Sequence, residues 1–213
     1  MKKLFALLLA LATVLSLAAC GDDNQNATEP LETFLLIDVT GDPFAETTGE
    51  EFLAGSSVEN TYKNEFIGIQ CSLNLDWTFT SDAELRTLNQ GNAAVIYDMM
   101  ANHSNNTDTV SVVVEKLSAA NGQITEEEYF AAAKEPTKAA LTSLGITVQS
   151  ADIIKLQFAG QERTALAISG DYLGYSVYEY LVAIKCGDYI ACVTVCTWDN
   201  NTCENILSQF QAY

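Results

Sequence analysis

The sequence contains few residues whose types and spacing are typical of catalytic or metal sites. His103 is the one histidine of the chain, and it lies in a polar stretch beside Asn102, Ser104 and Asn105. A lone histidine excludes a metal site built from several histidines of one chain. The sequence also lacks a phosphate-binding loop, a G-x-G-x-x-G pattern and EF-hand spacing. We therefore predict no catalytic residue, no metal ligand and no cofactor.

Acidic residues are numerous, so a pair of them is weak evidence for acid–base catalysis. The run 126–128 is best explained by the start of a helix, where negative charge is favoured. Asp199 is expected to be a corner or cap residue. A hydrolase that uses two acids remains an alternative, and it requires two inward carboxylates about 5–10 Å apart.

Aromatic residues are the more suggestive candidates for binding. The stretch GDYLGYSVYEY at 170–180 contains four tyrosines. Tyr178 and Tyr180 share one face of a predicted strand, and we expect them in the core under a helix. Tyrosine and tryptophan are rigid and amphipathic, and they are common in binding surfaces. The candidates for an exposed aromatic surface are Tyr172, Tyr175, Trp77 and Trp198.

The start of the chain predicts a membrane tether. Two lysines precede the apolar run 4–15, which suits a signal peptide and is too short to span a bilayer. Two alanines then precede Cys20, which resembles the lipobox of bacterial lipoproteins. The resemblance implies that residues 1–19 are removed and that the Cys20 thiol is lipidated. The membrane is then a partner, and the protein is extracytoplasmic, on the outer face of the cell membrane in a Gram-positive cell. An ordinary signal peptide with a chance cysteine is the alternative.

Composition limits the partners of the mature chain. Removing residues 1–19 from the 213 leaves 194, enough for one domain with a linker. Eight basic residues remain against 28 acidic ones, a formal charge of −20, because Lys2 and Lys3 leave with the signal peptide. Such a surface repels nucleic acid. The charge itself is explained by solubility, whereas binding of a cation or a basic partner would require clustered acids.

Five cysteines follow Cys20, and we expect them to be small buried side chains of the core. They are Cys71, Cys186, Cys192, Cys196 and Cys203. Cys192 and Cys196 share a predicted strand and lie about 13 Å apart, too far for a disulfide. A bridge between Cys196 and Cys203 is the alternative that the spacing allows.

We divide the mature chain into a linker at 20–57 and a compact domain at 58–213. The segment 21–32 is polar and lacks periodicity, as in a flexible tether. The apolar segment FLLIDV at 34–39 either forms an extra edge strand, docks on the domain or belongs to a disordered stalk.

Three helices are predicted in the domain. Ser81 and Glu84 form a capping box for a helix at 82–89, and Thr125 and Glu128 form another for 125–145. Pro136 lies inside the second helix and is expected to kink or divide it. The last helix is predicted at 200–211.

The rest of the domain predicts an antiparallel sheet. The expected strands are 66–73, 93–101, 109–117, 146–149, 153–159, 163–169, 174–185 and 189–197. The last of them is apolar on both faces, which indicates that the sheet is covered on both sides.

The order of these segments resembles the PsbP-like fold, in particular uncharacterised lipoproteins of anaerobic Gram-positive bacteria. The segments are NEFIGIQCSLNLDWTF, a capped helix, YDMMA, VSVVVEKL, a long helix, LQFAGQERTALAI, KCGDYIACVTV and a final helix. The resemblance covers about 58–213 and implies an α+β fold, an antiparallel β-sheet flanked by helices on both faces. The usual Pro-Glu-Gly before the tryptophan is replaced here by Asn74-Leu75-Asp76.

The resemblance brings no catalytic motif, and the members of this fold act as binding or assembly factors. We therefore expect a membrane-tethered, non-catalytic binding or assembly module with a protein partner. A receptor for a small ligand or cation, and the acid-based hydrolase, are the alternatives.

Overall fold

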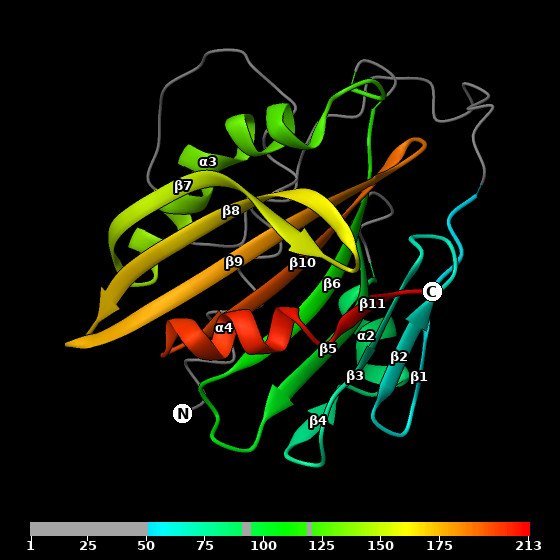
Figure 1. The fold of residues 1–213 in the computed structure, drawn as a ribbon, viewed down its shortest axis with the longest axis horizontal. Helices are drawn as coiled ribbons and strands as arrows, with labels where there is room; N and C mark the ends of the chain where they lie inside the picture. The colour runs from blue at the N-terminus through cyan, green and yellow to red at the C-terminus, as the bar shows by residue number, and fades with distance from the viewer. Residues whose placement is uncertain (1–50, 91–94, 119–120) are drawn as a thin grey trace.

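A computed structural model of the chain describes residues 51–90, 95–118 and 121–213. Cys20 and the segment 34–39 lie outside the described residues. The described chain folds into two antiparallel sheets and three helices (Figure 1), which is the α+β class expected from the sequence.

The larger sheet has seven strands in the order β4-β5-β6-β10-β9-β8-β7. Its strands are β4 (Trp77–Phe79), β5 (Val95–His103), β6 (Thr109–Lys116), β7 (Thr147–Phe158), β8 (Gln161–Tyr172), β9 (Tyr175–Cys186) and β10 (Tyr189–Thr197). The segments 146–149 and 153–159, predicted as two strands, are one strand β7 with an irregular register between Val148 and Ser150.

A smaller sheet of four strands packs beside the first, and the sequence predicted one of its strands, at 66–73, but not the sheet. Its strands are β1 (Ser56–Val58), β2 (Thr61–Asn64), β3 (Ile69–Ser72) and β11 (Phe210–Ala212), in the order β1-β2-β3-β11. The predicted helix 200–211 was therefore too long. Helix α4 (Asn200–Leu207) ends earlier, and the chain then pairs with β3.

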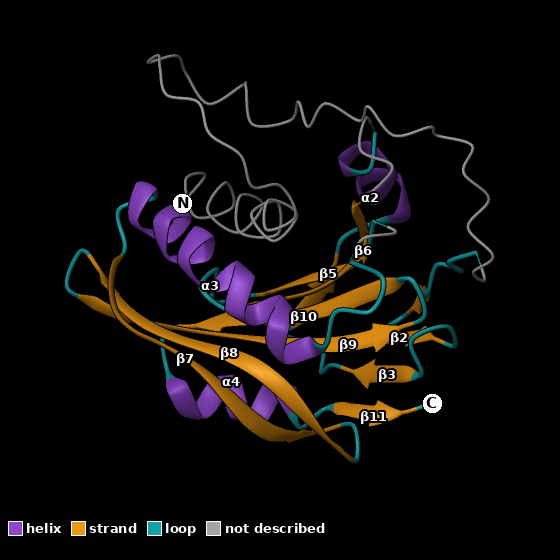
Figure 2. Cartoon of the chain, turned by 90° about the horizontal axis from the view of Figure 1, so that it is seen from above, coloured by secondary structure: helices purple, strands orange, loops and turns teal. Residues whose placement is uncertain are grey.

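Helices cover both faces of the larger sheet. Helix α3 (Glu126–Ser143) packs on β7, β8 and β9, and α2 (Asp82–Leu88) packs on β5. Figure 2 shows these two helices on one side of the sheet and α4 on the other. The sandwich predicted from the sequence is confirmed, and the small sheet shares the α4 side with that helix.

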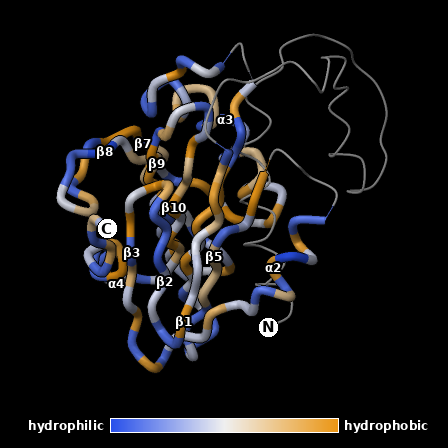
Figure 3. Tube along the Cα trace, turned by 90° about the vertical axis from the view of Figure 1, so that its right-hand side faces the viewer, coloured by the Kyte–Doolittle hydropathy of each residue, from blue (hydrophilic) through white to orange (hydrophobic). Residues whose placement is uncertain are grey.

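The core lies on both sides of β10, because all nine residues of this strand are buried. Val193 and Val195 face the layer formed by α4 and the small sheet, whereas Ile190 and Cys192 face α3. Figure 3 shows the hydrophobic residues along inner strands such as β5 and β10. This two-sided burial is what the apolar pattern of 189–197 predicted.

Local signals determined the helix starts. Both predicted capping boxes are formed, at Ser81 with Glu84 and at Thr125 with Glu128. Asp199 caps α4 as expected, and its carboxylate accepts a hydrogen bond from the Thr202 amide at 2.9 Å. Helix α3 runs through Pro136 as one element, so the proline does not divide it.

A buried carboxylate joins the two sheets. Asp98 lies at the β-bulge of β5 and accepts hydrogen bonds from the Tyr62 hydroxyl, the Asn64 amide at 2.8 Å and the Gly55 amide at 2.9 Å. A Cβ at Gly55 would lie 2.6 Å from the Tyr62 ring, so only glycine fits there. The ordered contacts therefore begin before Val58, and even Phe52 packs against Tyr189.

Candidate binding site

The tip of the β8–β9 hairpin presents apolar side chains to solvent. Leu173 and Gly174 form the turn with φ values of +54° and +87°, the backbone that two-residue hairpins favour. The Asp171 carboxylate accepts the Gly174 amide at 2.9 Å and holds the turn. The side chain of Leu173 is 79% exposed.

Two aromatic residues stack next to this tip. The rings of Tyr175 and Trp198 lie 4.8 Å apart between centroids with an interplanar angle of 26°. Tyr175 begins β9 and is 57% exposed, while Trp198 follows β10 and directly precedes the cap of α4. We call Leu173, Tyr175 and Trp198 the aromatic tip.

The other two sequence candidates do not belong to this exposed surface. Trp77 is only 8% exposed, because it packs in the core at the sheet edge and meets the His103 ring edge-on at 5.1 Å. Tyr172 is half-buried against the α3 side of the core. Tyr178 and Tyr180 pack against the core on the α4 side as predicted, and the Tyr180 hydroxyl donates to Asn200.

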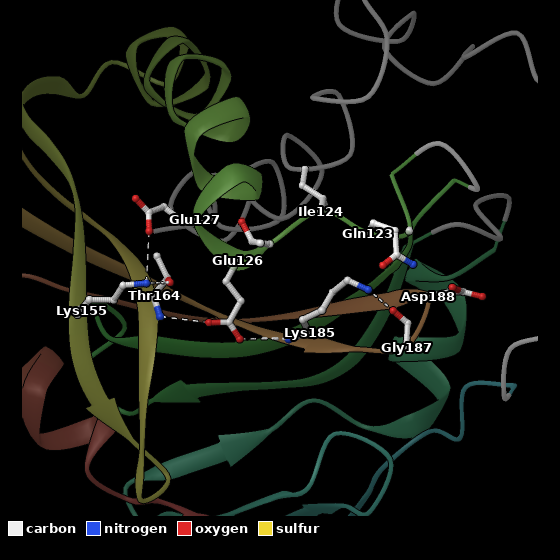
Figure 4. Close-up of a pocket in the computed structure, with 11 residues that line it drawn as sticks. Gln123, Ile124, Glu126, Glu127, Lys155, Thr164, Lys185, Gly187 and Asp188 are labelled. Atoms are coloured by element: carbon white, nitrogen blue, oxygen red, sulfur yellow. Dashed lines mark hydrogen bonds and ion pairs between the residues drawn. The ribbon is translucent and has the colours of Figure 1, made fainter.

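A polar pocket of about 790 Å³ lies at the start of α3, at the other end of β9. It is lined by Gly122, Gln123, Ile124, Thr125, Glu126, Glu127, Lys155, Thr164, Lys185, Gly187 and Asp188. Figure 4 shows Glu126 reaching between Thr164 and Lys185. Lys185 and Tyr175 are ten residues apart on β9, about 33 Å, so the tyrosines do not converge on this pocket.

Two of the three acids that line the pocket, Glu126 and Glu127, are already engaged. Glu126 pairs with Arg163 at 2.9 Å and accepts the Thr164 and Lys185 amides. Glu127 lies 3.6 Å from the Lys155 ammonium, which also donates to Thr164. Glu126 therefore holds α3 on the sheet and is not free for proton transfer.

Two other glutamates lie on the α3 face, Glu115 half-buried and Glu179 fully buried. Burial raises the pKa of Glu115 to about 7, although the Tyr129 hydroxyl, which donates to Glu115 at 3.0 Å, lowers it. Burial alone raises the pKa of Glu179 to about 8. Glu115 lies opposite Ile190, and Glu179 lies opposite Cys196. These two positions on β10 are about 20 Å apart, so the two acids cannot act as a catalytic pair.

The five cysteines of the domain are unpaired thiols. Four are buried as predicted, and Cys186 is half-buried. The bridge between Cys196 and Cys203 is not formed. Cys196 lies on the α3 face of β10, whereas Cys203 lies in α4 on the opposite face, where its thiol is 3.3 Å from the Thr197 hydroxyl.

Within the ranges that the structure describes, no cluster of three or more histidine, cysteine or acidic side chains is placed to hold a metal. None of the helices described is both long and apolar enough to cross a membrane. The sequence did not reveal Leu173 or Glu179 as site candidates. The one sequence signal for Glu179 was that an acidic residue occupies a position predicted to face inward on a strand of alternating pattern.

No protein-family model and no curated protein matches the chain. Among solved structures it is similar to cyanobacterial PsbP (CyanoP) from Synechocystis sp. PCC 6803, with 12% identity and a TM-score of 0.47 over 81% of this chain and 100% of that one. It is also similar to LpqN, involved in cell envelope biogenesis of Mycobacterium tuberculosis, with 15% identity and a TM-score of 0.40 over 67% and 82% of the two chains. The Ran-binding protein Mog1p of Saccharomyces cerevisiae has 10% identity and a TM-score of 0.38 over 68% and 90%.

Proposed function

We propose that this protein is a membrane-tethered, extracytoplasmic binding module that holds a protein partner and catalyses no reaction. The observation that carries the proposal is the aromatic tip, in which Tyr175 and Trp198 stack and remain accessible beside Leu173. Tyrosine and tryptophan dominate the energy of protein interfaces, because they bury a large area and lose little conformational freedom.

The fold holds the tip in place before a partner binds. Tyr175 follows a hydrogen-bonded turn, and Trp198 lies between β10 and the capped start of α4. Two secondary-structure elements therefore restrain the two rings, which lowers the entropy cost of association. A lipid on Cys20 would keep this surface at the membrane, with residues 21–50 as the connection to the fold.

The test is site-specific photo-crosslinking in the native cell. A photoreactive phenylalanine analogue at position 175 is expected to give one dominant protein adduct, and Trp198→Ala is expected to remove that adduct. The control position is Glu162, an exposed residue near the opposite end of the β8–β9 hairpin. The same adducts at both positions, or none at 175, would contradict a partner surface at the tip.

A small-ligand receptor is the second candidate, favoured by the pocket at the start of α3. The ammonium of Lys185 has no acidic partner among the described ion pairs, and it donates only to the Gly187 carbonyl. A ligand that stabilises the wild type but not Lys185→Met would support this function. The acid-based hydrolase is not proposed, because Glu126 is committed to Arg163 and the buried acids lie far apart.

A further inference from the structure

The unsatisfied buried side-chain oxygens of the described chain gather in one place. They are Oε1 and Oε2 of Glu179 and Oγ1 of Thr109. Glu179 is 1% exposed, and both of its carboxylate oxygens lack a hydrogen-bond partner. Leaving a buried acceptor unpaired is costly, and a charged one more so. Three such atoms scattered over the fold would be unremarkable, but their common location points to a missing donor.

Strand register puts these atoms in one row. Glu179 of β9 lies opposite Cys196 of β10, and Cys196 lies opposite Thr109 of β6. Neighbouring strands are about 4.8 Å apart, so the row spans about 10 Å from Glu179 to Thr109. All three side chains point to the α3 side of the sheet, because Leu181 and Cys192, two and four residues away on β9 and β10, belong to that core.

The aromatic tip continues this row along the same face. Tyr175 and Glu179 lie four residues apart on β9, with Val177 between them, so all three share one face. Trp198 follows Cys196 by two residues, and its stacking on Tyr175 places it over the same face. Trp198 and Glu179 are therefore diagonal neighbours about 7–8 Å apart.

We propose that Glu179, Tyr175 and Trp198 form a site for a cationic side chain, a lysine or an arginine, of the protein partner. This inference rests on the proposed binding function of the tip and names the chemistry that the tip recognises. Aromatic faces attract an ammonium or guanidinium group, and the methylene stem of such a side chain packs along exposed apolar surface such as that of Leu173. The head group then supplies the donors that the Glu179 carboxylate and the Thr109 hydroxyl lack.

Charge favours a cation over other groups at this position. An anionic group would meet the Glu179 carboxylate and a chain with 28 acidic residues against 10 basic ones. An apolar group would leave all three oxygens unpaired. A lysine or arginine satisfies them and matches the aromatic rings at the entrance.

The test is a titration of the mature chain, labelled with nitrogen-15 at tryptophan, with the peptide Gly-Gly-Lys-Gly-Gly. The two indole signals report separately, since Trp198 belongs to the tip and the buried Trp77 does not. We expect the peptide to shift the Trp198 signal in a saturable way and to leave Trp77 unchanged. In a titration at pH 9, where the Glu179 carboxylate is ionised and the lysine is still charged, Glu179→Gln should weaken binding about tenfold or more, because it removes the negative charge and keeps the shape. Glu162→Gln removes an exposed charge elsewhere and should have no effect.

Two further probes decide the source and the chemistry. The same peptide with an acetylated lysine should not bind, because it has lost the charge. If butylammonium binds more tightly than the peptide, the occupant is a free amine and the protein source is wrong.

If Trp198 does not respond, or responds equally in the wild type and Glu179→Gln, the cation site is overturned. Trp198→Leu, which leaves Glu179 in place, should also weaken binding and covers the case in which Glu179→Gln fails to fold. Photo-crosslinks at position 175 that persist in Glu179→Gln would then leave the proposed binding function standing.

Discussion

At the scale of single residues, Glu179 is a side chain whose burial opposes folding when it is ionised. It is 1% exposed, and neither carboxylate oxygen has a partner. Desolvation disfavours the charged form, which is why its pKa rises from 4.5 to about 8. Such a position is a liability for stability, and proteins retain liabilities of this kind where they serve binding.

This raised pKa makes stability depend on pH in a defined direction. Between about pH 4.5 and 8 the folded chain holds a proton on Glu179 that the unfolded chain has released, so the free energy of unfolding falls as the pH rises. The difference between wild type and Glu179→Gln should change over this window by on the order of 4 kcal/mol. The nearby thiols do not interfere, because the pKa values of Cys192 and Cys203 are raised to about 12 and burial holds that of Cys196 well above its ordinary value.

Urea unfolding of the wild type and of Glu179→Gln at pH 5 and pH 8 checks this expectation. Glu115, with a pKa raised to about 7, titrates in both chains and cancels in the comparison. Parallel pH dependence in the two chains would mean that Glu179 is ionised and solvated in the folded protein.

At the scale of elements, one buried carboxylate links the small sheet to the large sheet by hydrogen bonds, in addition to the hydrophobic core that they share. The Asp98 carboxylate at the bulge of β5 gathers the Tyr62 hydroxyl, the Asn64 amide and the Gly55 amide. These donors come from β2 and from the segment before β1, so Asp98 positions the start of the domain. Burial and the Asp98 charge raise the pKa of Tyr62, so its hydroxyl remains a donor at neutral pH.

Asp98→Ala should therefore destabilise the protein by about 3–5 kcal/mol, since several buried donors lose their acceptor together. Asp152→Ala is the matched control, because Asp152 is exposed on β7 of the same sheet, and it should cost less than about 0.5 kcal/mol. Thermal unfolding of the three chains gives the comparison. Equal losses for both substitutions would show that the Asp98 contact does not stabilise the fold.

At the scale of the whole molecule, the proposed lipid tether on Cys20 would set where the tip operates. The described fold begins near Phe52, so the mature chain would have about thirty residues between Cys20 and the domain. If Cys20 carries a multi-chain lipid as proposed, that lipid would keep the domain at the membrane.

Cys20→Ser should release the protein from the membrane fraction, because serine cannot form the thioether to the lipid. Cys186→Ser is the control, as it removes a half-buried thiol and should leave the protein in the membrane fraction. Fractionation followed by mass analysis of the N-terminal peptide measures both outcomes. A Cys20→Ser chain that stays fully membrane-bound would contradict the lipid anchor.

The sequence predicted the features that depend on neighbouring residues. The capping boxes at Ser81 and Thr125, the cap at Asp199 and the two-sided burial of β10 were all correct. Each involves groups within a few positions of one another or a periodic pattern along one strand, so chain geometry alone places them.

Only the tertiary structure decided the features that depend on distant segments. The pairing of β11 with β3, the separation of Cys196 from Cys203 and the burial of Trp77 follow from which face or edge each element occupies. The same is true of the candidate site, where strand register brings Glu179 into line with Thr109 and stacking brings Tyr175 onto Trp198. Local sequence does not encode such neighbours, because strand order and sheet register are settled only when the whole core packs.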